Sequence, residues 1–554
     1  MARMVPLIPV LKDLAVGAAL PVLDAFGLLD FLPNIRLFAQ MRLLARSAGE
    51  TKGTLATRKK ILFMSLKGAW VNHLAWEYSL AAALQIRGAE CTFLLCDKAL
   101  PKCDVKLHNN SFRTRCLACH AYSRTFAKYL GMPALWLSQF LSEEEEQRLR
   151  KTAFSIPYEE LERIKFDGLD VQHTIKPSLV RYFRRGSLDG SEHTKQIHRE
   201  FFYAGLTAAT ALKKILASVR PDAVITVNGK FFAENILFQL CRREGIDIYT
   251  YERGKIKDTL NIVHNDISVD WDNTRAWEAV SGRDLSPQEK STIENYISDR
   301  KRGLKTVLHF HPNPQEDELL IKRQAGFREG KKHFVLFTNL VWDSAVQYKD
   351  TIFANMFEWI RETIVFFADH PDANLIVRIH PAEVKIASDV TEERTGDYLK
   401  NAFAKMPPNV CVVSPESDIS SYRLIELSDG VLVYTSTVGI EAALERKPVV
   451  VAGLTHYSGK GFTLDPGSRE EYFNVLRGLV VDGRVAALDW ASAWKYAYVF
   501  FFKAMTAFPW VSERRIGVVD GISFQSSSEL VPGKSRALDV LCDDILSGND
   551  VTIE

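Results

Sequence analysis

Small hydroxyl residues stand between a buried apolar run and a predicted helix in the second half of the chain. Ser436 and Thr437 follow the apolar residues 431–434, and the helix is expected to begin directly after them. Backbone N–H groups at a helix start favour a phosphate, as does the helix dipole. The two hydroxyl groups can add further hydrogen-bond donors. This pattern predicts a phosphate or nucleotide site.

Two residues in the first turn of the same predicted helix support this interpretation. Gly439 would let a ligand approach the backbone closely. Glu441 could accept hydrogen bonds from ribose or sugar hydroxyls. An ordinary capping box, in which a hydroxyl residue is followed by a glutamate, is the alternative, and both interpretations can hold together.

A histidine and a proline follow another apolar run. Residues 375–379 are expected to form a strand, and His380 and Pro381 come directly after it. Proline suits the first turn of a helix. Ligands in parallel α/β sheets bind beyond the carboxyl ends of the strands, so we expect His380 near the same phosphate. A structural histidine is the alternative, and the nearby hydroxyl segment favours nucleotide binding.

Three carboxylates at predicted strand ends are candidates for a general base or a nucleophile. Glu252 follows the strand expected at 246–251 and is the first candidate. Glu234 follows the strand expected at 223–227 and is the second. Asp343 follows a strand in the second half of the chain and could instead cap the next helix. A salt bridge or a helix cap is the alternative for the two glutamates.

Lys67 and Gly68 follow the first expected strand, at residues 61–64. A glycine at this point would let a donor phosphate or an acceptor sugar come close, and a plain strand-to-helix turn is the alternative. The sequence has no Asp-x-Asp triplet at an expected strand end. We therefore predict that catalysis requires no divalent metal and no other cofactor.

Five of the eight cysteines lie between residues 91 and 119. Cys116 and Cys119 form a Cys-x-x-Cys pair, the usual half of a structural zinc site, and Cys96 and Cys103 form a wider pair. The alternatives are an iron–sulfur cluster and reduced thiols without a metal. The segment 116–120 also matches the haem attachment pattern, which we discount because no export signal is recognised. A zinc ion would fix the loop after the second strand and take no part in sugar chemistry.

The elements that must position these residues alternate between strand and helix. Two such series, at 56–300 and 331–485, each indicate a parallel sheet with helices on both faces. The fold class is therefore α/β, with two Rossmann-like domains facing a cleft and the cysteine-rich insertion in the first. Residues 301–330 are polar and are expected to be the linker. Residues 1–55 and 486–554 are expected to be helical additions.

Composition excludes several classes of protein. The 554 residues are 47% hydrophobic and 25% charged, as in ordinary globular proteins. The 70 basic residues nearly match the 68 acidic ones, which argues against a nucleic-acid partner. No apolar run is long enough for a transmembrane helix, so a cytoplasmic protein is expected. Residues 1–55 either lie on the inner membrane surface as an amphipathic segment or form a helical cap on the first domain.

The stretch from 338 to 463 resembles bacterial capsule polysaccharide biosynthesis proteins. The matching pieces are 339–343, 378–383, 436–441 and 447–450, followed by Tyr457 and 459–463. The resemblance implies a GT-B-like glycosyltransferase whose C-terminal domain binds a nucleotide sugar. The family includes transferases of 3-deoxy-manno-octulosonic acid (Kdo), which use a CMP donor. By resemblance, His380, Ser436 and Thr437 contact the donor phosphate, while CMP, UDP and GDP remain open as the nucleotide.

These observations together predict a glycosyltransferase. It would move a sugar from a CMP-Kdo-like, UDP-sugar or GDP-sugar donor to a surface polysaccharide or a lipid-linked glycan. Peripheral contact with the inner membrane would fit such an acceptor. Two alternatives stay open, a nucleotide-sugar 2-epimerase and a non-catalytic factor for capsule assembly or export.

Overall fold

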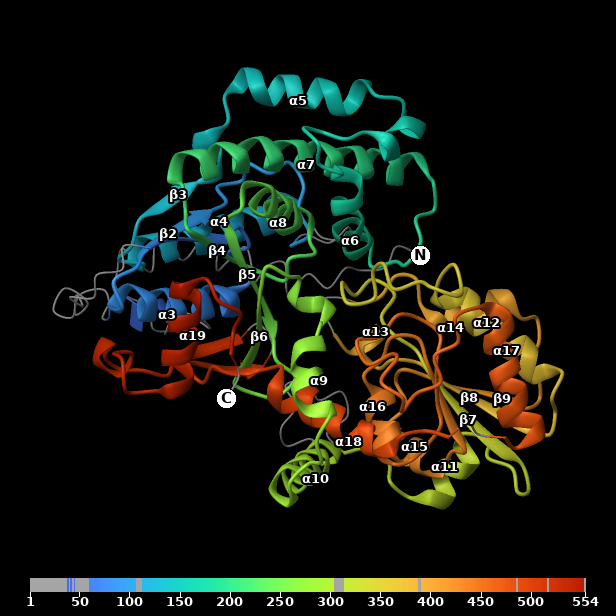
Figure 1. The fold of residues 1–554 in the computed structure, drawn as a ribbon. Helices are drawn as coiled ribbons and strands as arrows, with labels where there is room; N and C mark the ends of the chain where they lie inside the picture. The colour runs from blue at the N-terminus through green and yellow to red at the C-terminus, as the bar shows by residue number, and fades with distance from the viewer. Residues whose placement is uncertain are drawn as a thin grey trace. The chain divides into compact units, whose positions relative to one another are not determined.

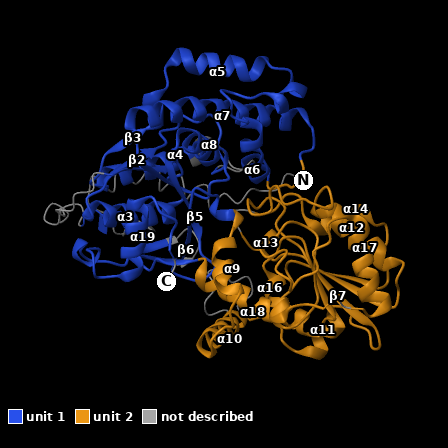
Figure 2. Ribbon diagram, viewed as in Figure 1, with its two compact units in different colours: residues 1–183, 188–269, 505–554 blue, residues 184–187, 270–504 orange. Residues whose placement is uncertain are grey.

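The chain divides into two compact units, each built on its own sheet (Figures 1 and 2). Unit 1 comprises residues 1–183, 188–269 and 505–554, and unit 2 comprises residues 184–187 and 270–504. The structure is a computed structural model that describes residues 37, 38, 40, 41, 44, 59–105, 112–302, 313–386, 390–484, 487–515 and 518–552.

Unit 1 contains a seven-stranded sheet in the order β12-β6-β5-β4-β1-β2-β3. Strands β1 to β5 run parallel, and β6 and β12 are antiparallel to their neighbours. The strand order reverses between β1 and β4, which is the switch point where such sheets bind ligands. The strands are β1 (Lys60–Ser65), β2 (Glu90–Leu95), β3 (Ala134–Trp136), β4 (Ala223–Val227), β5 (Asp247–Arg253), β6 (Thr259–His264) and β12 (Thr506–Ala507).

Alternation along the strands of unit 1 buries both faces of the sheet. In β1, Ile61 and Phe63 share a core with α3, α4 and α19, while Leu62 and Met64 share another with α5 to α8. Successive side chains of a strand point to opposite faces of the sheet, so a strand with a core on each side is apolar at every position. The helices are α3 (Val71–Ile86), α4 (Phe112–Tyr129), α5 (Glu143–Ser155), α6 (Val171–Phe183), α7 (Glu192–Val219), α8 (Phe232–Glu244) and α19 (Arg536–Ser547).

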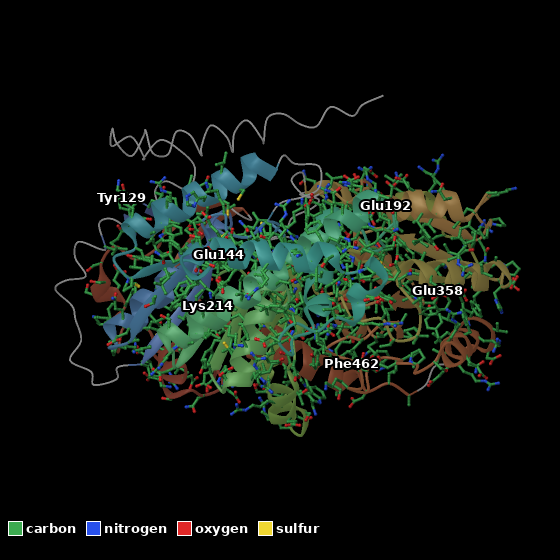
Figure 3. The ribbon with its side chains drawn as sticks, turned by 90° about the horizontal axis from the view of Figure 1, so that it is seen from above. Tyr129, Glu144, Glu192, Lys214, Glu358 and Phe462 are labelled. Carbon is green, nitrogen blue, oxygen red and sulfur yellow. The ribbon has the colours of Figure 1, made fainter. Side chains whose placement is uncertain are left out.

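The long helix α7 supports the outer layer of unit 1. Glu192 and Lys214, labelled in Figure 3, mark its beginning and its last turns. Lys214 Nζ pairs with the Glu145 carboxylate on α5 at 2.6 Å. The pair joins α5 to α7, although exposed ion pairs of this kind stabilise a fold only slightly.

The described part of the N-terminal segment packs in the core of unit 1. Leu37, Phe38 and Met41 are fully buried among the residues around α3. The Gln40 side chain donates to the Ile522 carbonyl at 3.1 Å and accepts from the Ile522 N–H at 2.8 Å. These residues form the helical cap that was one of the two expectations. The rest of residues 1–55, on which the membrane-surface expectation depends, lies outside the described residues.

The end of the chain returns to unit 1 and is not helical throughout. Strand β12 pairs with β6, and β13 (Val511–Arg515) and β14 (Val518–Ile522) form a hairpin before α19. The predicted helical tail at 486–554 therefore needs correction at 506–507, 511–515 and 518–522, which are strands. Strand β12 has two residues and pairs with β6, which is distant in sequence, and the hairpin of β13 and β14 is short and irregular in register, so local periodicity does not reveal these strands.

Unit 2 contains a five-stranded parallel sheet in the order β11-β10-β7-β8-β9. Its switch point lies between β7 and β10. The strands are β7 (Lys332–Phe337), β8 (Ala373–Arg378), β9 (Val410–Val413), β10 (Gly430–Val433) and β11 (Val449–Val451). The helices are α9 (Thr274–Ser281), α10 (Pro287–Lys301), α11 (Glu318–Gln324), α12 (Met356–Ala368), α13 (Ala382–Lys385), α14 (Thr395–Ala402), α15 (Ser421–Leu427), α16 (Val438–Leu444), α17 (Arg469–Arg477) and α18 (Trp490–Tyr498).

The boundary between the units differs from the expected one. Helices α9 and α10, expected at the end of the first domain, belong to unit 2. Tyr296 of α10 packs on Phe501, with ring centroids 4.7 Å apart, which explains this assignment. The expected linker at 301–330 contains α11, and its residues 303–312 lie outside the described part. The expectation of two Rossmann-like α/β units is confirmed. Among the described helices, none has the length and apolarity needed to cross a membrane.

Candidate functional site

Polar residues follow three neighbouring strands at the carboxyl edge of the unit 2 sheet. Thr338 and Asn339 follow β7, His380 follows β8, and Thr435 follows β10. The His380 N–H donates to Thr338 Oγ1 at 2.9 Å, and the Thr435 N–H donates to Asn339 Oδ1 at 3.3 Å. These hydrogen bonds connect the three strand ends across the switch point, where parallel sheets bind ligands.

His380 is held as a neutral imidazole. Its Nδ1 accepts a hydrogen bond from the Ala382 N–H at 3.1 Å, so the ring proton lies on Nε2. Burial lowers the pKa of His380 to about 4, the nearby Asp343 carboxylate acts in the opposite direction, and Arg378 lowers it further. At neutral pH this side chain therefore supplies an uncharged N–H donor.

The hydroxyl segment follows β10 at the same edge of the sheet, separated from the histidine by β7, and its backbone is already hydrogen-bonded. Ser436 and Thr437 are half-buried. The amides that follow are used locally, because Gly439 N–H donates to the Ser436 carbonyl and Ile440 N–H to the Thr437 carbonyl. Helix α16 has only seven residues. The side-chain hydroxyls, rather than free helix amides, are therefore the donors that this segment can offer to a phosphate.

Gly439 serves packing instead of close ligand approach. A Cβ atom at this position would lie 2.4 Å from Tyr457 Oη. Tyr457 is fully buried, and its hydroxyl donates to the Ser436 carbonyl at 2.6 Å. The glycine is needed because the tyrosine occupies the space that a side chain would take.

Glu441 is a structural residue. Its carboxylate pairs with the Arg300 guanidinium of α10 at 2.9 Å, and its side chain is only 4% exposed. The expected role in binding sugar hydroxyls is therefore not supported, because the group is buried and paired. Pro381 precedes the single turn α13 with φ −57°, as expected for a helix start.

Asp343 lies in a turn between β7 and α12. Its Oδ1 accepts from the Ala345 N–H at 2.9 Å. It does not cap the next helix, because α12 begins at Met356 and is capped by Asn355. Asp343 is half-buried and close enough to His380 to influence its pKa. It remains a candidate carboxylate beside the histidine.

In unit 1, Lys67 lies at the switch point and is enclosed by carboxylates. Its Nζ lies 2.8 Å from Asp104 Oδ2 and 3.0 Å from Glu234 Oε1. Burial lowers the pKa of Lys67, but the two carboxylates outweigh this effect and raise it. Burial raises the pKa of Glu234, which is fully buried. Because Glu234 is enclosed and paired with Lys67, it is not placed to take a proton from a substrate, and the charge of Lys67 is already compensated.

Gly68 also permits packing, and its expected contact with a ligand is not supported. A Cβ atom there would lie 2.3 Å from Ser123 Oγ and 2.5 Å from the Cys119 carbonyl oxygen. Both groups belong to α4. The glycine therefore allows α4 to approach the loop after β1.

Glu252 is an accessible carboxylate near the carboxyl end of β5. Asn228 Nδ2 donates to Glu252 Oε2 at 2.7 Å, and the Arg253 N–H donates to Oε1 at 3.0 Å. The side chain is held in place but is only half-buried. In unit 1 it meets the requirement for a general base better than Glu234.

Sequence reasoning missed a buried network behind Glu252. Tyr251 Oη donates to Glu77 Oε1 at 2.7 Å, and Ser65 Oγ donates to the other oxygen of the same carboxylate. His73 Nδ1 lies 3.2 Å from Tyr251 Oη. Burial raises the pKa of Glu77 to about 8. Apart from His73, Glu77 is the one titratable acid or base in the sequence of α3. A single carboxylate in an otherwise apolar helix was the sequence signal that could have indicated this network.

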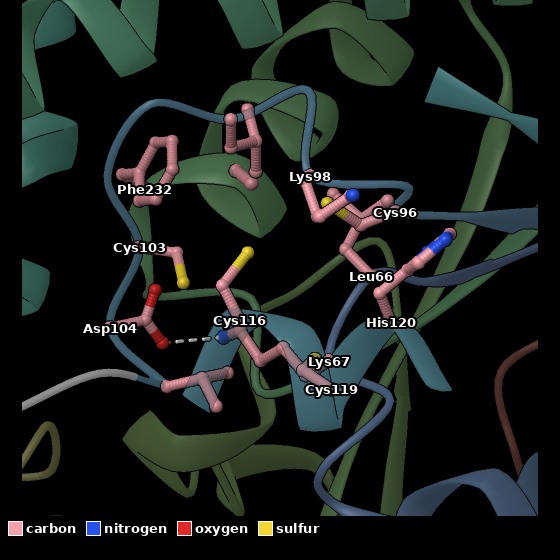
Figure 4. Close-up of a pocket in the computed structure, with 13 residues that line it drawn as sticks. Leu66, Lys67, Cys96, Lys98, Cys103, Asp104, Cys116, Cys119, His120 and Phe232 are labelled. Atoms are coloured by element: carbon pink, nitrogen blue, oxygen red, sulfur yellow. Dashed lines mark ion pairs between the residues drawn. The ribbon is translucent and has the colours of Figure 1, made fainter. Parts of the chain in front are cut away.

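The four cysteines of the predicted zinc site line one pocket of unit 1 (Figure 4). Cys96 and Cys103 come from the loop after β2, and Cys116 and Cys119 come from α4. Among the described residues, no group of three or more His, Cys, Asp or Glu side chains is placed to hold a metal ion. The pocket also contains Lys67 and Asp104.

The resemblance to capsule polysaccharide proteins is confirmed for part of the chain. Residues 302–475 match the family model described as "Capsule polysaccharide biosynthesis protein". This range contains Asp343, His380 and the segment 436–441. No curated protein matches the sequence.

Several solved structures share a limited similarity with the chain. The Thermosulfurimonas dismutans KpsC beta Kdo 2,7 transferase is 17% identical, with 52% of this chain and 79% of that chain covered and a TM-score of 0.30. The beta Kdo 2,4 transferase of the same protein is 15% identical, with 56% and 87% covered and a TM-score of 0.33. The UDP-GlcNAc 2-epimerase of Neisseria meningitidis is 9% identical, with 79% and 96% covered and a TM-score of 0.24. At these scores the similarity carries no conclusion about substrate or residues.

Proposed function

We propose that the protein is a glycosyltransferase of capsule or surface polysaccharide synthesis that uses a nucleotide-sugar donor. One observation carries the proposal. Within the family match at 302–475, the neighbouring strands β8, β7 and β10 end at one edge of the sheet, His380 follows β8 and the hydroxyl segment follows β10, and hydrogen bonds of Thr338 and Asn339 link these strand ends. Uncharged donors of this kind suit the phosphate of a nucleotide.

His380, Ser436 and Thr437 are proposed to contact the donor phosphate. Nε2–H and two hydroxyl groups would stabilise the charge that develops on the phosphate as the glycosidic bond breaks. Glu252 is the proposed general base for the acceptor hydroxyl, and Asp343 is the competing candidate. Catalysis is proposed to need no metal ion. The donor is CMP-Kdo-like or a UDP- or GDP-sugar, and the acceptor is a glycan or a lipid-linked glycan.

The proposed location is the cytoplasm, with peripheral contact to the inner membrane. A lipid-linked acceptor would account for such contact. The alternatives are a nucleotide-sugar 2-epimerase and a non-catalytic factor of capsule assembly or export. An epimerase would rearrange the sugar without an acceptor, and an assembly factor would bind without turnover.

The donor site is tested by thermal shift with CMP, UDP, GDP and their sugars. A ligand that binds the native state alone must raise the melting temperature. We expect one nucleotide class to raise Tm for the unmodified protein and to lose this effect in the His380→Ala/Ser436→Ala variant. The matched control is His370→Ala/Ser298→Ala. His370 follows α12 before the amino end of β8, and Ser298 is exposed on α10.

The control variant should keep the shift. A shift that survives in the His380→Ala/Ser436→Ala variant would contradict the proposed site. No shift with any nucleotide would remove the support for a donor site and favour the assembly factor. If one nucleotide binds, release of that nucleotide from its sugar, with and without a glycan acceptor, separates transferase from epimerase. Glu252→Gln should reduce kcat by about 10²–10⁴-fold if Glu252 is the base.

A further inference from the structure

One face of helix α4 is exposed and carries basic and apolar side chains. Tyr129, labelled in Figure 3, ends this helix. Phe126 and Tyr129 are buried in the core around α3. Leu117, Arg124 and Lys128 are exposed and recur at the spacing of one or two helical turns, so they share the opposite face. Leu117 keeps 48% of its surface exposed, although it is a large apolar residue.

His120 connects this face of α4 with two neighbouring segments. Its ring packs on Trp136 at the end of β3, with ring centroids 5.8 Å apart. Burial lowers the pKa of His120, and Lys98 and Arg124 lower it further, so both cations lie within electrostatic range of the ring. Figure 4 shows Lys98 and His120 on the same side of the neighbouring pocket. Lys98, Leu117, His120, Arg124 and Trp136 are together called the α4 surface.

The α4 surface has an excess of positive charge. No ion pair joins Lys98 or Arg124 to another residue that the structure describes. The carboxylate of Asp97, which acts on His120 in the opposite direction, accepts from the Ser138 N–H at 3.2 Å and from the Ser138 hydroxyl. Residues 105–142 contain five lysine and arginine residues and no aspartate or glutamate. Such a surface complements an anionic partner.

The apolar members of the α4 surface favour a bilayer over a soluble polyanion. A soluble polyanion is attracted by charge alone. A bilayer also takes up apolar side chains such as Leu117, and its interface favours tryptophan, here the half-buried Trp136. Reversible attachment of this kind becomes stable when a second apolar element adds to it.

A second apolar element joins unit 1 beside α4. Phe38 stacks on Tyr122 of α4, with ring centroids 6.3 Å apart. The chain that precedes Phe38 therefore enters unit 1 next to this helix. Residues 4–11 of that chain carry no charge. The basic face of α4 and an apolar segment are thus attached to the same side of the unit.

We propose that the α4 surface docks on an anionic phospholipid bilayer. The inference rests on the proposed peripheral contact with a membrane and names the surface that makes it. Lys98 follows β2 and Trp136 ends β3, so the surface lies at the carboxyl edge of the unit 1 sheet, where Glu252 also lies. Strands β2 and β5 are three strand spacings apart, about 14 Å. A docked bilayer would therefore present a lipid-linked glycan beside the proposed base.

Sedimentation of the full-length protein with lipid vesicles tests the α4 surface. The unmodified protein should bind vesicles of phosphatidylcholine mixed with phosphatidylglycerol and should not bind phosphatidylcholine alone. A cation near an anionic surface contributes about fivefold, equivalent to about 1 kcal/mol, so Lys98→Gln/Arg124→Gln should weaken binding about 25-fold. The control Lys405→Gln/Arg446→Gln removes two exposed cations of unit 2 and should bind normally. No binding by the unmodified protein, or equal binding by Lys98→Gln/Arg124→Gln, overturns the proposal.

A variant without a change of charge separates the bilayer from a soluble polyanion. Leu117→Ser should weaken vesicle binding and leave binding to dextran sulfate unchanged, and high salt should release the protein from vesicles. Vesicle binding that is unaffected by Leu117→Ser overturns the bilayer in favour of a soluble polyanion. Tm, expected to be unchanged because the substituted side chains are exposed, checks the fold of each variant. Vesicle binding needs no nucleotide and no turnover, so a failure of the proposed transferase activity would be seen separately.

Discussion

Tyr457 Oη donates a hydrogen bond to the Ser436 backbone carbonyl at 2.6 Å. The tyrosine comes from the segment after β11 and is fully buried, so it fixes the backbone of the hydroxyl segment from behind. The backbone at Ser436 is thereby tied to a buried side chain of the core. In the proposed donor site, such a fixed backbone would let the hydroxyls meet a developing charge without further rearrangement.

The contact between Gly439 and Tyr457 leads to a first prediction. Gly439→Ala should destabilise the protein by about 1–3 kcal/mol, because the added methyl group would meet Tyr457 Oη at 2.4 Å. Tyr457→Phe alone should have a smaller effect, about 0.5–1.5 kcal/mol, since only a hydrogen bond is lost. Urea unfolding of the two single variants and the double variant measures the coupling. Strictly additive effects would argue against this contact.

Thr338 should control the position of His380. Thr338→Val keeps the shape of this buried side chain but removes the acceptor of the His380 N–H. An unsatisfied buried amide costs about 1–3 kcal/mol, so Tm should fall. Nucleotide binding should weaken as well, measured by calorimetry. Unchanged affinity together with lowered stability would show that the threonine does not position the histidine.

Glu441 should matter for stability and not for ligand affinity. Glu441→Gln leaves the Arg300 guanidinium without its charged partner. The loss should be about 2–3 kcal/mol. This is below the value for a fully buried pair, because the Arg300 side chain is 20% exposed. Unfolding and nucleotide titration on the same variant check both parts. A large loss of affinity in a stable variant would restore Glu441 to the ligand site.

Glu77 should make stability depend on pH. Its pKa is raised from 4.5 to about 8 in the folded protein, so between these values the folded state holds a proton that the unfolded state has lost. The contribution of Glu77 is therefore full below pH 4.5 and declines as pH rises to about 8, by about 1.4 kcal/mol per pH unit. Glu77→Gln should flatten this part of the stability profile. Denaturant titrations at several pH values give the comparison, and an equal slope in both proteins would contradict the prediction.

Local sequence was sufficient for most strands and for their order along the chain. The strand expected at 223–227 is β4, and the helix expected from 232 to 244 is α8. Strands buried on both faces appear as continuous apolar runs, and helices show a period of 3.6 residues, so both are visible without tertiary information. The strand ends that carry His380 and Ser436 could be identified for the same reason.

The partners of charged groups could not be found in this way. Arg300 and Glu441 are 141 residues apart in sequence, and Lys67 meets Glu234 from another strand end. A carboxylate has the same local sequence pattern whether it faces a ligand or a buried cation. The reason for a glycine at position 439 could not be predicted from local sequence either. Tyr457, which occupies the space beside it, comes from the segment after β11.

The sequence by itself determined two α/β units, the resemblance of the segment 338–463, and the strand ends where chemistry should occur. Only the tertiary structure decided which of those residues keep a side chain available. It shows that Glu234 and Glu441 are engaged in buried ion pairs. It also shows that the cysteines of the loop after β2 and those of α4 line the same pocket. The physical reason is that hydrophobic periodicity acts within one element, whereas burial and ion pairing depend on elements that meet only after folding.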